Sequence, residues 1–255
     1  NAPLSSSDAA AARLFRNSNQ AISLYRLPSK HVRVTILSMI KKAGENMSVK
    51  HTAVSYYGLN YVEHAEKDFR EMAGHGCDTV ILAITEFDMD FWFPNISNIV
   101  KTAHKTGLRC IADPWGIGKY FGGEQVSLFL QNNIRHRQVS AYTGEVLNAA
   151  CFNTNAFRDY FTGICLKLAR ETEVDGFFWD EPHYAYPKAY ASITGGPGDD
   201  WTCRCPECMK KFADYYGYEM TKFMNDDVKQ FRWREALKTL ADCSCLLKEV
   251  NPGLE

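Results

Sequence analysis

The sequence predicts an α/β fold of the (β/α)8 TIM-barrel type, with the first four to five βα units preceded by an N-terminal extension. From His51 onward, short apolar runs alternate with segments of helical periodicity, which is the order of βαβ units around a parallel sheet. Polar or aromatic residues follow the ends of these runs, where parallel strands place functional groups. We therefore expect the first half of a barrel, with its site at the strand ends.

Each expected element rests on a local pattern. The run V-I-L-A-I after Thr79 and the aromatic G-F-F-W after Asp175 are short and apolar, as buried parallel strands are. Gly107 ends a helix as a C-cap, and Pro182 stops the fourth strand. The expected strands are residues 52–57, 79–85, 108–112 and 176–179, and the expected helices are residues 61–73, 96–105, 157–168 and 227–250. Segment 117–150 is long enough to be functional rather than a simple connection.

The composition is that of an ordinary globular protein. The 255 residues are 45% hydrophobic and 23% charged with a formal net charge of −1, which suits one sizeable domain and does not suggest nucleic-acid binding. No apolar run approaches the roughly 20 residues of a membrane span, and the first residues lack the plan of a signal peptide. Nine cysteines, three of them clustered, fit a reducing compartment better than a disulfide scaffold, so we expect a cytoplasmic protein.

Two adjacent carboxyl groups, Asp180 and Glu181, stand at the end of the fourth predicted strand. Acidic residues there are better site candidates than acids inside a helix, although capping or ion pairing is the plain alternative. Successive side chains on a strand point to opposite faces, so both cannot face the same substrate atom. We expect one of them to act and the other to support it.

Three cysteines, Cys203, Cys205 and Cys208, form a C-x-C-x2-C motif directly downstream. Thiolates this close are too cramped to pair as disulfides but can converge on one soft cation, for which zinc is the natural choice. Three reduced surface thiols are the alternative. A closed structural site needs a fourth ligand, and Cys151 and His183 are the candidates by chemistry alone.

These residues together resemble a known family. A strand-tip Glu, a loop, and C-x-C-x2-C-x3-F leading into an aromatic-Gly pair are similar to the β-galactosidases of glycoside hydrolase family 42. Residues 151–158, C-F-N-T-N-A-F-R, are similar to that family's Cys-Pro-Asn-Ser-Pro-x-Tyr-Arg stretch. The resemblance implies that Glu181 is the general acid/base and that Cys151 completes the zinc site. Asp180 stands where the family has Asn, and an ionised Asp accepts hydrogen bonds but cannot donate one.

The remaining candidates for substrate binding lie at or just beyond the predicted strand ends. They are Tyr57, Glu86, Asp113, Trp115 and His183. Trp115 offers an indole that could stack on a pyranose ring, although a packed loop anchor is an equal alternative. Glu86 and Asp113 are expected to support the site by hydrogen bonding rather than to act as catalysts.

The resemblance leaves the second catalytic carboxyl group open. In the resembled family the nucleophile is a Glu at the tip of strand seven, whereas this chain ends where strand five should start. The chain is then a fragment of a longer enzyme, a half-barrel that completes itself as a homo-oligomer through its open sheet edge, or an enzyme that uses Glu86 or Asp113 as the second group. We divide the chain into an extension of unknown role at residues 1–46 and a barrel domain at 47–255, with a zinc loop at 201–217.

The expected function is cleavage of a β-glycosidic bond in a carbohydrate. Glu181 would protonate the leaving oxygen, with its pKa raised by apolar neighbours or by Asp180, while a structural zinc ion holds the loop beside the site. One rival is a zinc-stabilised carbohydrate-binding protein without turnover. The other is a metalloenzyme whose catalytic zinc has an open position and takes His183 in place of one Cys.

Overall fold

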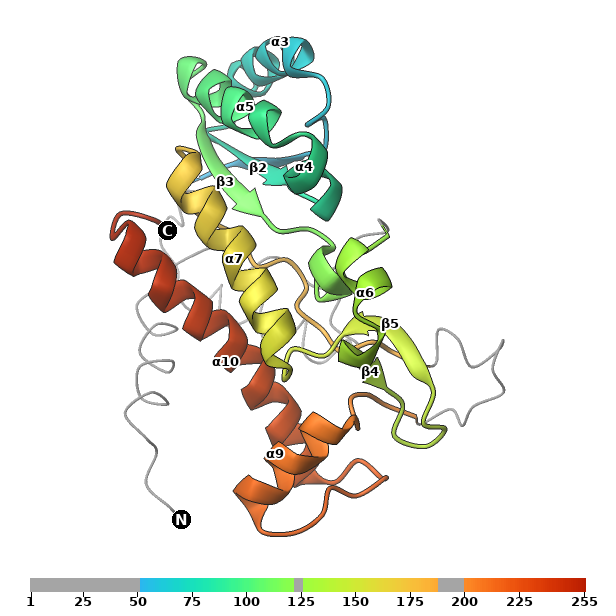
Figure 1. Cartoon of the computed structure of the whole chain (residues 1–255). Helices are drawn as coiled ribbons and strands as arrows, with labels where there is room; N and C mark the ends of the chain where they lie inside the picture. Colours follow the sequence, from blue (N-terminus) through green and yellow to red (C-terminus); the bar gives the residue numbers. More distant parts are fainter. Residues whose placement is uncertain (1–50, 122–125, 188–199) are drawn as a thin grey trace, which may run out of the picture. The chain divides into compact units, whose positions relative to one another are not determined.

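The centre of the fold is a sheet of four parallel strands. The computed structural model describes residues 51–121, 126–187 and 200–255. Within these, the sheet has the order β1 (Ala53–Tyr56), β2 (Thr79–Ala83), β3 (Arg109–Asp113) and β6 (Gly176–Phe177) (Figure 1). Strands follow one another in the sheet as they do in the sequence, which confirms the predicted βα order and the α/β class.

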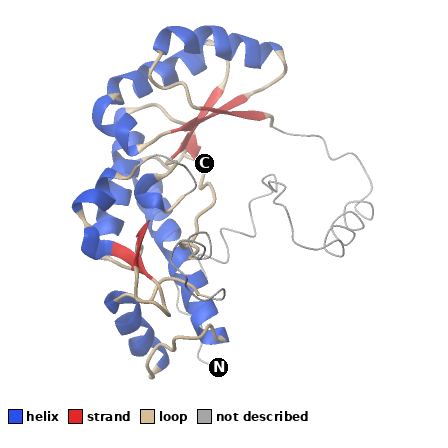
Figure 2. Cartoon of the chain, turned by 90° about the vertical axis from the view of Figure 1, so that its right-hand side faces the viewer, coloured by secondary structure: helices blue, strands red, loops and turns tan. Residues whose placement is uncertain are grey.

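Helices make the crossovers between the strands. Helix α3 (Val62–Gly74) joins β1 to β2, α4 (Glu86–Phe91) and α5 (Phe93–Lys105) join β2 to β3, and α7 (Asn155–Glu171) precedes β6. The helices around the sheet lie on one side of it (Figure 2). Helix α3 packs on α5, and α7 packs on the long helix α10 (Asp226–Val250).

The two faces of the sheet differ in their burial. One face of the sheet carries every second residue of β2 and β3, and these side chains are fully buried in the main apolar core: Val80, Leu82, Cys110 and Ala112. Ile111 on the other face is only partly buried. Asp113 lies two residues beyond Ile111 and therefore belongs to this second, less covered face.

The chain meets the free edge of β6 at its last residues. Glu255 donates its backbone N–H to the Asp175 carbonyl and accepts the N–H of Phe177, which is the pattern of a parallel strand pair. Gly176 permits this approach, because a Cβ there would lie 2.7 Å from the Glu255 carbonyl oxygen. Residues 254–255 thus occupy the position of a fifth strand beside β6.

The long segment after β3 contains elements that the sequence pattern did not indicate. It includes two short 3-10 turns, η1 (Ile117–Lys119) and η2 (Ile134–His136), the helix α6 (Leu128–Asn132), and the antiparallel pair β4 (Arg137–Val139) and β5 (Val146–Ala150). After β6, helix α9 (Pro206–Tyr216) begins within the cysteine motif, with Cys205 as its N-cap residue and Cys208 in its first turn, and ends at Gly217, which has a left-handed φ of 77°. This hairpin and α9 form a second apolar cluster, separate from the main core.

Residues 51–255 form one compact unit. The predicted extension at residues 1–46 lies outside the described residues, as do 188–199 within the predicted loop after the fourth strand. Among the helices that the structure describes, none combines the length and the apolar character needed to span a membrane.

Candidate active site and metal centre

Asp113 ends strand β3 with a buried carboxyl group. The residue is 3% exposed, and its Oδ1 atom has no hydrogen-bond partner. Burial, and then the charge of Asp180, raise the pKa of Asp113 to about 8. Asp113 therefore carries its proton at neutral pH, as a neutral acid next to a second carboxyl group.

Asp180 is that second carboxyl group, and the alternation of side chains after β6 explains its position. Phe177 and Trp179 stack on one another with ring centroids 5.7 Å apart and pack against the main core, whereas Phe178 between them is 36% exposed. Because side chains alternate, Asp180 points to the same side as Phe178, and this is the face of the sheet that also carries Asp113. Burial, and then the charge of Glu181, raise the pKa of Asp180 above its ordinary value.

Glu181 lies where the backbone turns away from the strand. Its φ of 42° is in the left-handed region, which is uncommon for a residue other than glycine, and its side chain is exposed. The Glu181 carbonyl oxygen lies 2.7 Å from Nδ1 of His183, which is also exposed. The exposure of the three carboxyl groups thus increases in steps: Asp113 is buried, Asp180 is partly exposed and Glu181 is exposed.

Two aromatic rings meet at the same edge of the sheet. Tyr57, which follows β1, is 61% exposed and contacts Trp115 edge-to-face with ring centroids 5.3 Å apart. Trp115 comes two residues after Asp113 and is partly exposed. The geometry is compatible with an apolar sugar face packing beside the carboxyl groups.

The side chain of Glu86 is buried in the protein and is not exposed at this edge of the sheet. It is the first residue of α4, is 3% exposed, and accepts hydrogen bonds from the Gly118 N–H, the Ser127 hydroxyl and the Phe129 N–H at 2.6–2.8 Å. Its carboxylate holds the segment after β3 in place. Both carboxylate oxygens of Glu86 are therefore already bonded within the chain.

The four predicted cysteine ligands come together. Sγ atoms of Cys151, Cys203, Cys205 and Cys208 all lie within 4.8 Å of one another, and each residue is at most 3% exposed. Cys151 Sγ is 3.5 Å from the sulfurs of both Cys205 and Cys208. A tetrahedral site with zinc–sulfur bonds of about 2.3 Å has sulfurs about 3.8 Å apart, so this group could hold such a metal ion. His183 is not part of the group.

The surroundings of the sulfurs suit thiolates bound to a cation. The Val139 N–H points to Cys203 Sγ at 3.4 Å, and the Asn153 amide points to Cys208 Sγ at 3.3 Å, so donors are aimed at the sulfurs from outside the group. Hydrogen bonds from the other thiols lower the pKa of Cys205, whereas they and burial raise that of Cys208. The protein alone thus keeps part of the group protonated, and a bound cation would stabilise the remaining thiolates.

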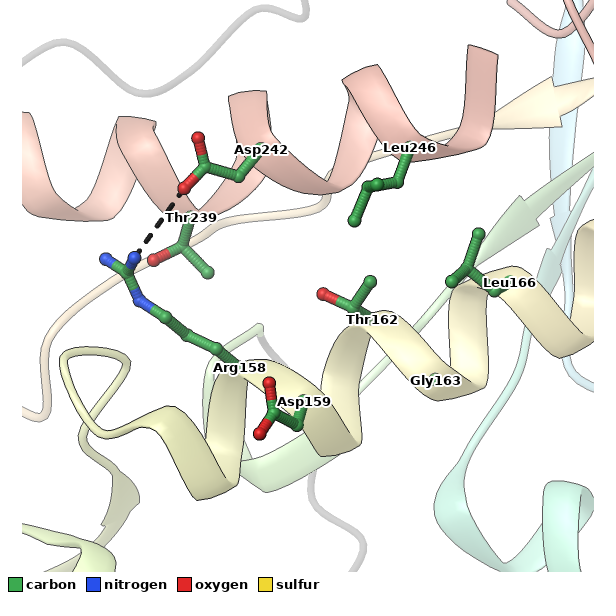
Figure 3. Close-up of a pocket in the computed structure, with 8 residues that line it drawn as sticks. All are labelled: Arg158, Asp159, Thr162, Gly163, Leu166, Thr239, Asp242 and Leu246. Carbon is green, nitrogen blue, oxygen red and sulfur yellow. Dashed lines mark ion pairs between the residues drawn. The ribbon is translucent and has the colours of Figure 1, made fainter. Parts of the chain in front are cut away.

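A separate shallow pocket of about 340 Å³ lies between α7 and α10 (Figure 3). Figure 3 shows Arg158 of α7 reaching across to Asp242 of α10, with 3.6 Å between the ion-pair atoms. Arg158 Nε also donates to the Phe152 carbonyl at 2.7 Å, so this arginine ties the two helices to the residue after Cys151. The pocket contains none of the predicted site residues.

Comparisons with known proteins show the fold. No protein-family model and no curated protein matches the sequence. Among solved structures, the chain is similar to alpha-L-fucosidase isoenzyme 2 from Paenibacillus thiaminolyticus, with a TM-score of 0.52 and 12% identity over 81% of this chain and 32% of that one. The chain thus spans about a third of the fucosidase structure and shares the fold of that part.

Two alpha-galactosidase structures are also similar to this chain, with lower TM-scores. An alpha-galactosidase from Lactobacillus brevis matches with a TM-score of 0.47 and 8% identity over 80% of this chain and 26% of that one. The GH36 alpha-galactosidase AgaB from Geobacillus stearothermophilus matches with the same TM-score and 7% identity over 80% and 27%. None of these matches singles out family 42.

The residues that connect the two sites carry no local sequence signal. Within the segment that follows Asp180, Tyr184 and Ala185 contact Gln138, Thr202 and Arg232, and Thr202 is next to Cys203 in the sequence. No local spacing marks a buried glutamine or threonine as a connection, because its partners come from distant segments. The exposed Cys245 and the buried Cys243 lie outside the group of four cysteines.

Proposed function

We propose that this chain provides part of the active site of a glycosidase that cleaves a glycosidic bond by carboxyl acid/base chemistry. The observation that carries the proposal is the pairing of Asp113 and Asp180 at the carboxyl edge of a parallel sheet, with a raised pKa on both. Glycoside hydrolysis uses pairs of carboxyl groups, and the ends of parallel strands are where such groups are commonly placed. The likeness to the fucosidase supports the same class through the fold.

The roles follow from exposure and protonation. Asp180 is the carboxylate that faces the sugar, as a base or nucleophile, because it is partly exposed beside an acid that stays neutral. Glu181 is the general acid, since it is the exposed carboxyl group. In a regular strand its side chain would point to the face opposite that of Asp180, but the backbone turn at φ 42° ends this alternation. Asp113 keeps a proton that it can donate in a hydrogen bond to Asp180 or to a substrate hydroxyl.

The finer assignments rest on the resemblance to family 42. It supports a β-glycoside as substrate and zinc as the ion in the cysteine group, where four thiols are the donor set that structural zinc prefers. Zinc held by four thiolates has no open position for substrate, so it would stabilise the fold and leave the chemistry to the carboxyl groups.

The test is hydrolysis of a panel of chromogenic α- and β-glycosides by the purified chain, beside Asp180→Asn and Glu181→Gln. Turnover that is lost in both variants supports the assigned roles, and the preferred substrate decides the linkage. Turnover in wild type that persists in Asp180→Asn would contradict the role of Asp180. An absence of turnover with every substrate would contradict independent catalysis by this chain.

A second candidate is a carbohydrate-binding protein without turnover. The exposed Tyr57–Trp115 pair favours it, because aromatic rings alone can bind a sugar face. Isothermal titration with the same sugars separates the two functions. Binding that survives Asp180→Asn without any hydrolysis in wild type supports this second candidate.

A further inference from the structure

We infer that Gln138 is a positioning residue, which transmits the order of the cysteine metal site to the carboxyl-bearing segment 180–185. The inference rests on the proposed function for its effect on catalysis. Its structural part, the coupling of the two regions, stands on the contacts of Gln138 and can be measured without substrate.

Gln138 lies in β4 and is fully buried. Its amide nitrogen donates to the Ala150 carbonyl at 3.0 Å, and its amide oxygen accepts the N–H of Ala185 at 2.9 Å and the hydroxyl of Thr202 at 2.6 Å. A buried amide that makes three hydrogen bonds at once has a fixed orientation, because losing any of them leaves an unsatisfied polar group.

Two of these three partners sit next to metal ligands. Ala150 immediately precedes Cys151, and Thr202 immediately precedes Cys203. The third partner, Ala185, lies five residues after Asp180. The Thr202 hydroxyl also lies 2.7 Å from the Ala185 carbonyl oxygen, so its single proton is shared between this oxygen and the amide oxygen of Gln138. Both polar groups of the Ala185 backbone are thus held by Gln138 or Thr202.

Tyr184 adds an apolar connection beside the polar one. Its ring contacts Phe152 with centroids 4.4 Å apart, and the guanidinium of Arg232 lies 4.2 Å from its centroid. The Tyr184 hydroxyl donates to the Arg232 carbonyl at 2.9 Å. Arg232 Nε in turn donates to the Thr202 carbonyl, again next to Cys203.

Segment 180–185 has no helix or strand of its own. Its described backbone bonds include those of His183 N–H to the Tyr120 carbonyl and of Ala185 N–H to Gln138. A segment without regular structure keeps one conformation only through such tertiary contacts. Loss of the metal would free the residues around Cys151 and Cys203, and with them the contacts that hold Ala185 and Tyr184.

The experiment is hydrogen–deuterium exchange on the zinc-loaded full chain, comparing wild type, Gln138→Leu and Thr202→Val. Gln131→Leu is the matched control, since Gln131 is exposed. We expect peptides covering 181–187 to exchange about tenfold faster in both test variants, which is the effect of losing one buried hydrogen bond. Zinc content near one per chain and unchanged exchange in β2 and β3 show that the rest of the unit is intact.

Removal of the metal from wild type with a chelator should accelerate exchange in the same 181–187 peptides. The inference is overturned if these peptides keep wild-type exchange in Thr202→Val or in the metal-free protein. It is equally overturned if exchange accelerates evenly over the whole unit, since that is general destabilisation.

Kinetics then test the positioning role separately. If the chain turns over a glycoside, Gln138→Leu should lower kcat about tenfold with KM nearly unchanged, because the aromatic contacts to the sugar remain. A raised KM with unchanged kcat would contradict a positioning role. If no glycoside is cleaved, independent catalysis by this chain is contradicted, while the exchange measurement still decides the coupling.

Discussion

The cysteine group and the strand-end carboxyl groups are both clusters of ionisable side chains, but they are built in opposite ways. All four sulfurs are buried and lie within 4.8 Å of one another, and those of Cys203 and Cys208 receive N–H donors. The carboxyl groups run from buried Asp113 to exposed Glu181, and Asp113 Oδ1 lacks a partner. In a purely structural metal site, every ligand atom has a partner once the metal is bound. A site that acts on a substrate instead contains polar groups that have no partner within the protein and are free to interact with the substrate.

Removing one ligand should produce the largest effect in the molecule. We expect Cys208→Ser to abolish tight zinc binding and to cost several kcal/mol of unfolding free energy, because metal binding to such groups is coupled to folding. Cys245→Ser, at an exposed cysteine outside the group, should change neither. Zinc content and thermal unfolding of the two variants measure this, and a zinc-loaded Cys208→Ser protein of wild-type stability would erase the contrast between the two sites.

Changing a carboxyl group should have the opposite signature, a loss of activity without a loss of fold. Asp180→Asn is expected to reduce kcat by about 10²–10⁴-fold, the contribution of a positioned acid or base, with unfolding free energy the same or higher. The control is Asp159→Asn, an exposed acid on α7. A drop in stability that matched the drop in activity would mean that Asp180 serves the fold.

The pH dependence of stability sharpens the same contrast at Asp113. Its pKa is raised from an ordinary value near 4 to about 8, so the folded state binds the proton more tightly than the unfolded state. This contribution is fully present below about pH 4 and is lost as the pH rises to about 8, at up to ~1.4 kcal/mol per pH unit. Asp113→Asn should flatten this slope in urea unfolding measured from pH 5 to 8. An unchanged slope would mean that Asp113 titrates normally.

The smallest expected effect concerns the aromatic pair. Trp115→Ala should weaken sugar binding by about 1 kcal/mol, roughly fivefold, because it removes one stacking surface and leaves the carboxyl groups in place. Titration calorimetry measures this, with Trp233→Ala as the control at an exposed tryptophan on α10. Equal affinities in the two variants would assign Trp115 to packing against Tyr57.

The sequence was informative where the signal is local. The strand run at 79–83 and the C-x-C-x2-C motif could be read directly, because hydrophobic periodicity and ligand spacing lie within a few residues. Cys151, some fifty residues upstream, was one of two candidates by chemistry and was favoured through the resemblance; the structure brings it to the group.

Long-range and overlooked local signals account for the rest. Helix α4 begins with a capping box in which Thr85 and Asp88 bond reciprocally, a T-x-x-D signal that places Glu86 in a helix and not at an open strand end. The β4–β5 pair has few β-branched residues to distinguish it from a loop. The three partners of Gln138 lie 12 to 64 positions away, so no pattern around residue 138 could reveal its role.

The cysteine group also closes a chain loop. Cys151 and Cys205 are separated by 54 positions, and both α7 and β6 lie between them in the sequence. A metal ion that joins these cysteines acts as a reversible cross-link, which lowers the conformational entropy of the unfolded chain as a disulfide does. If the metal binds early during folding, the strand that ends at the carboxyl groups would search for its place in the sheet from within an already closed loop.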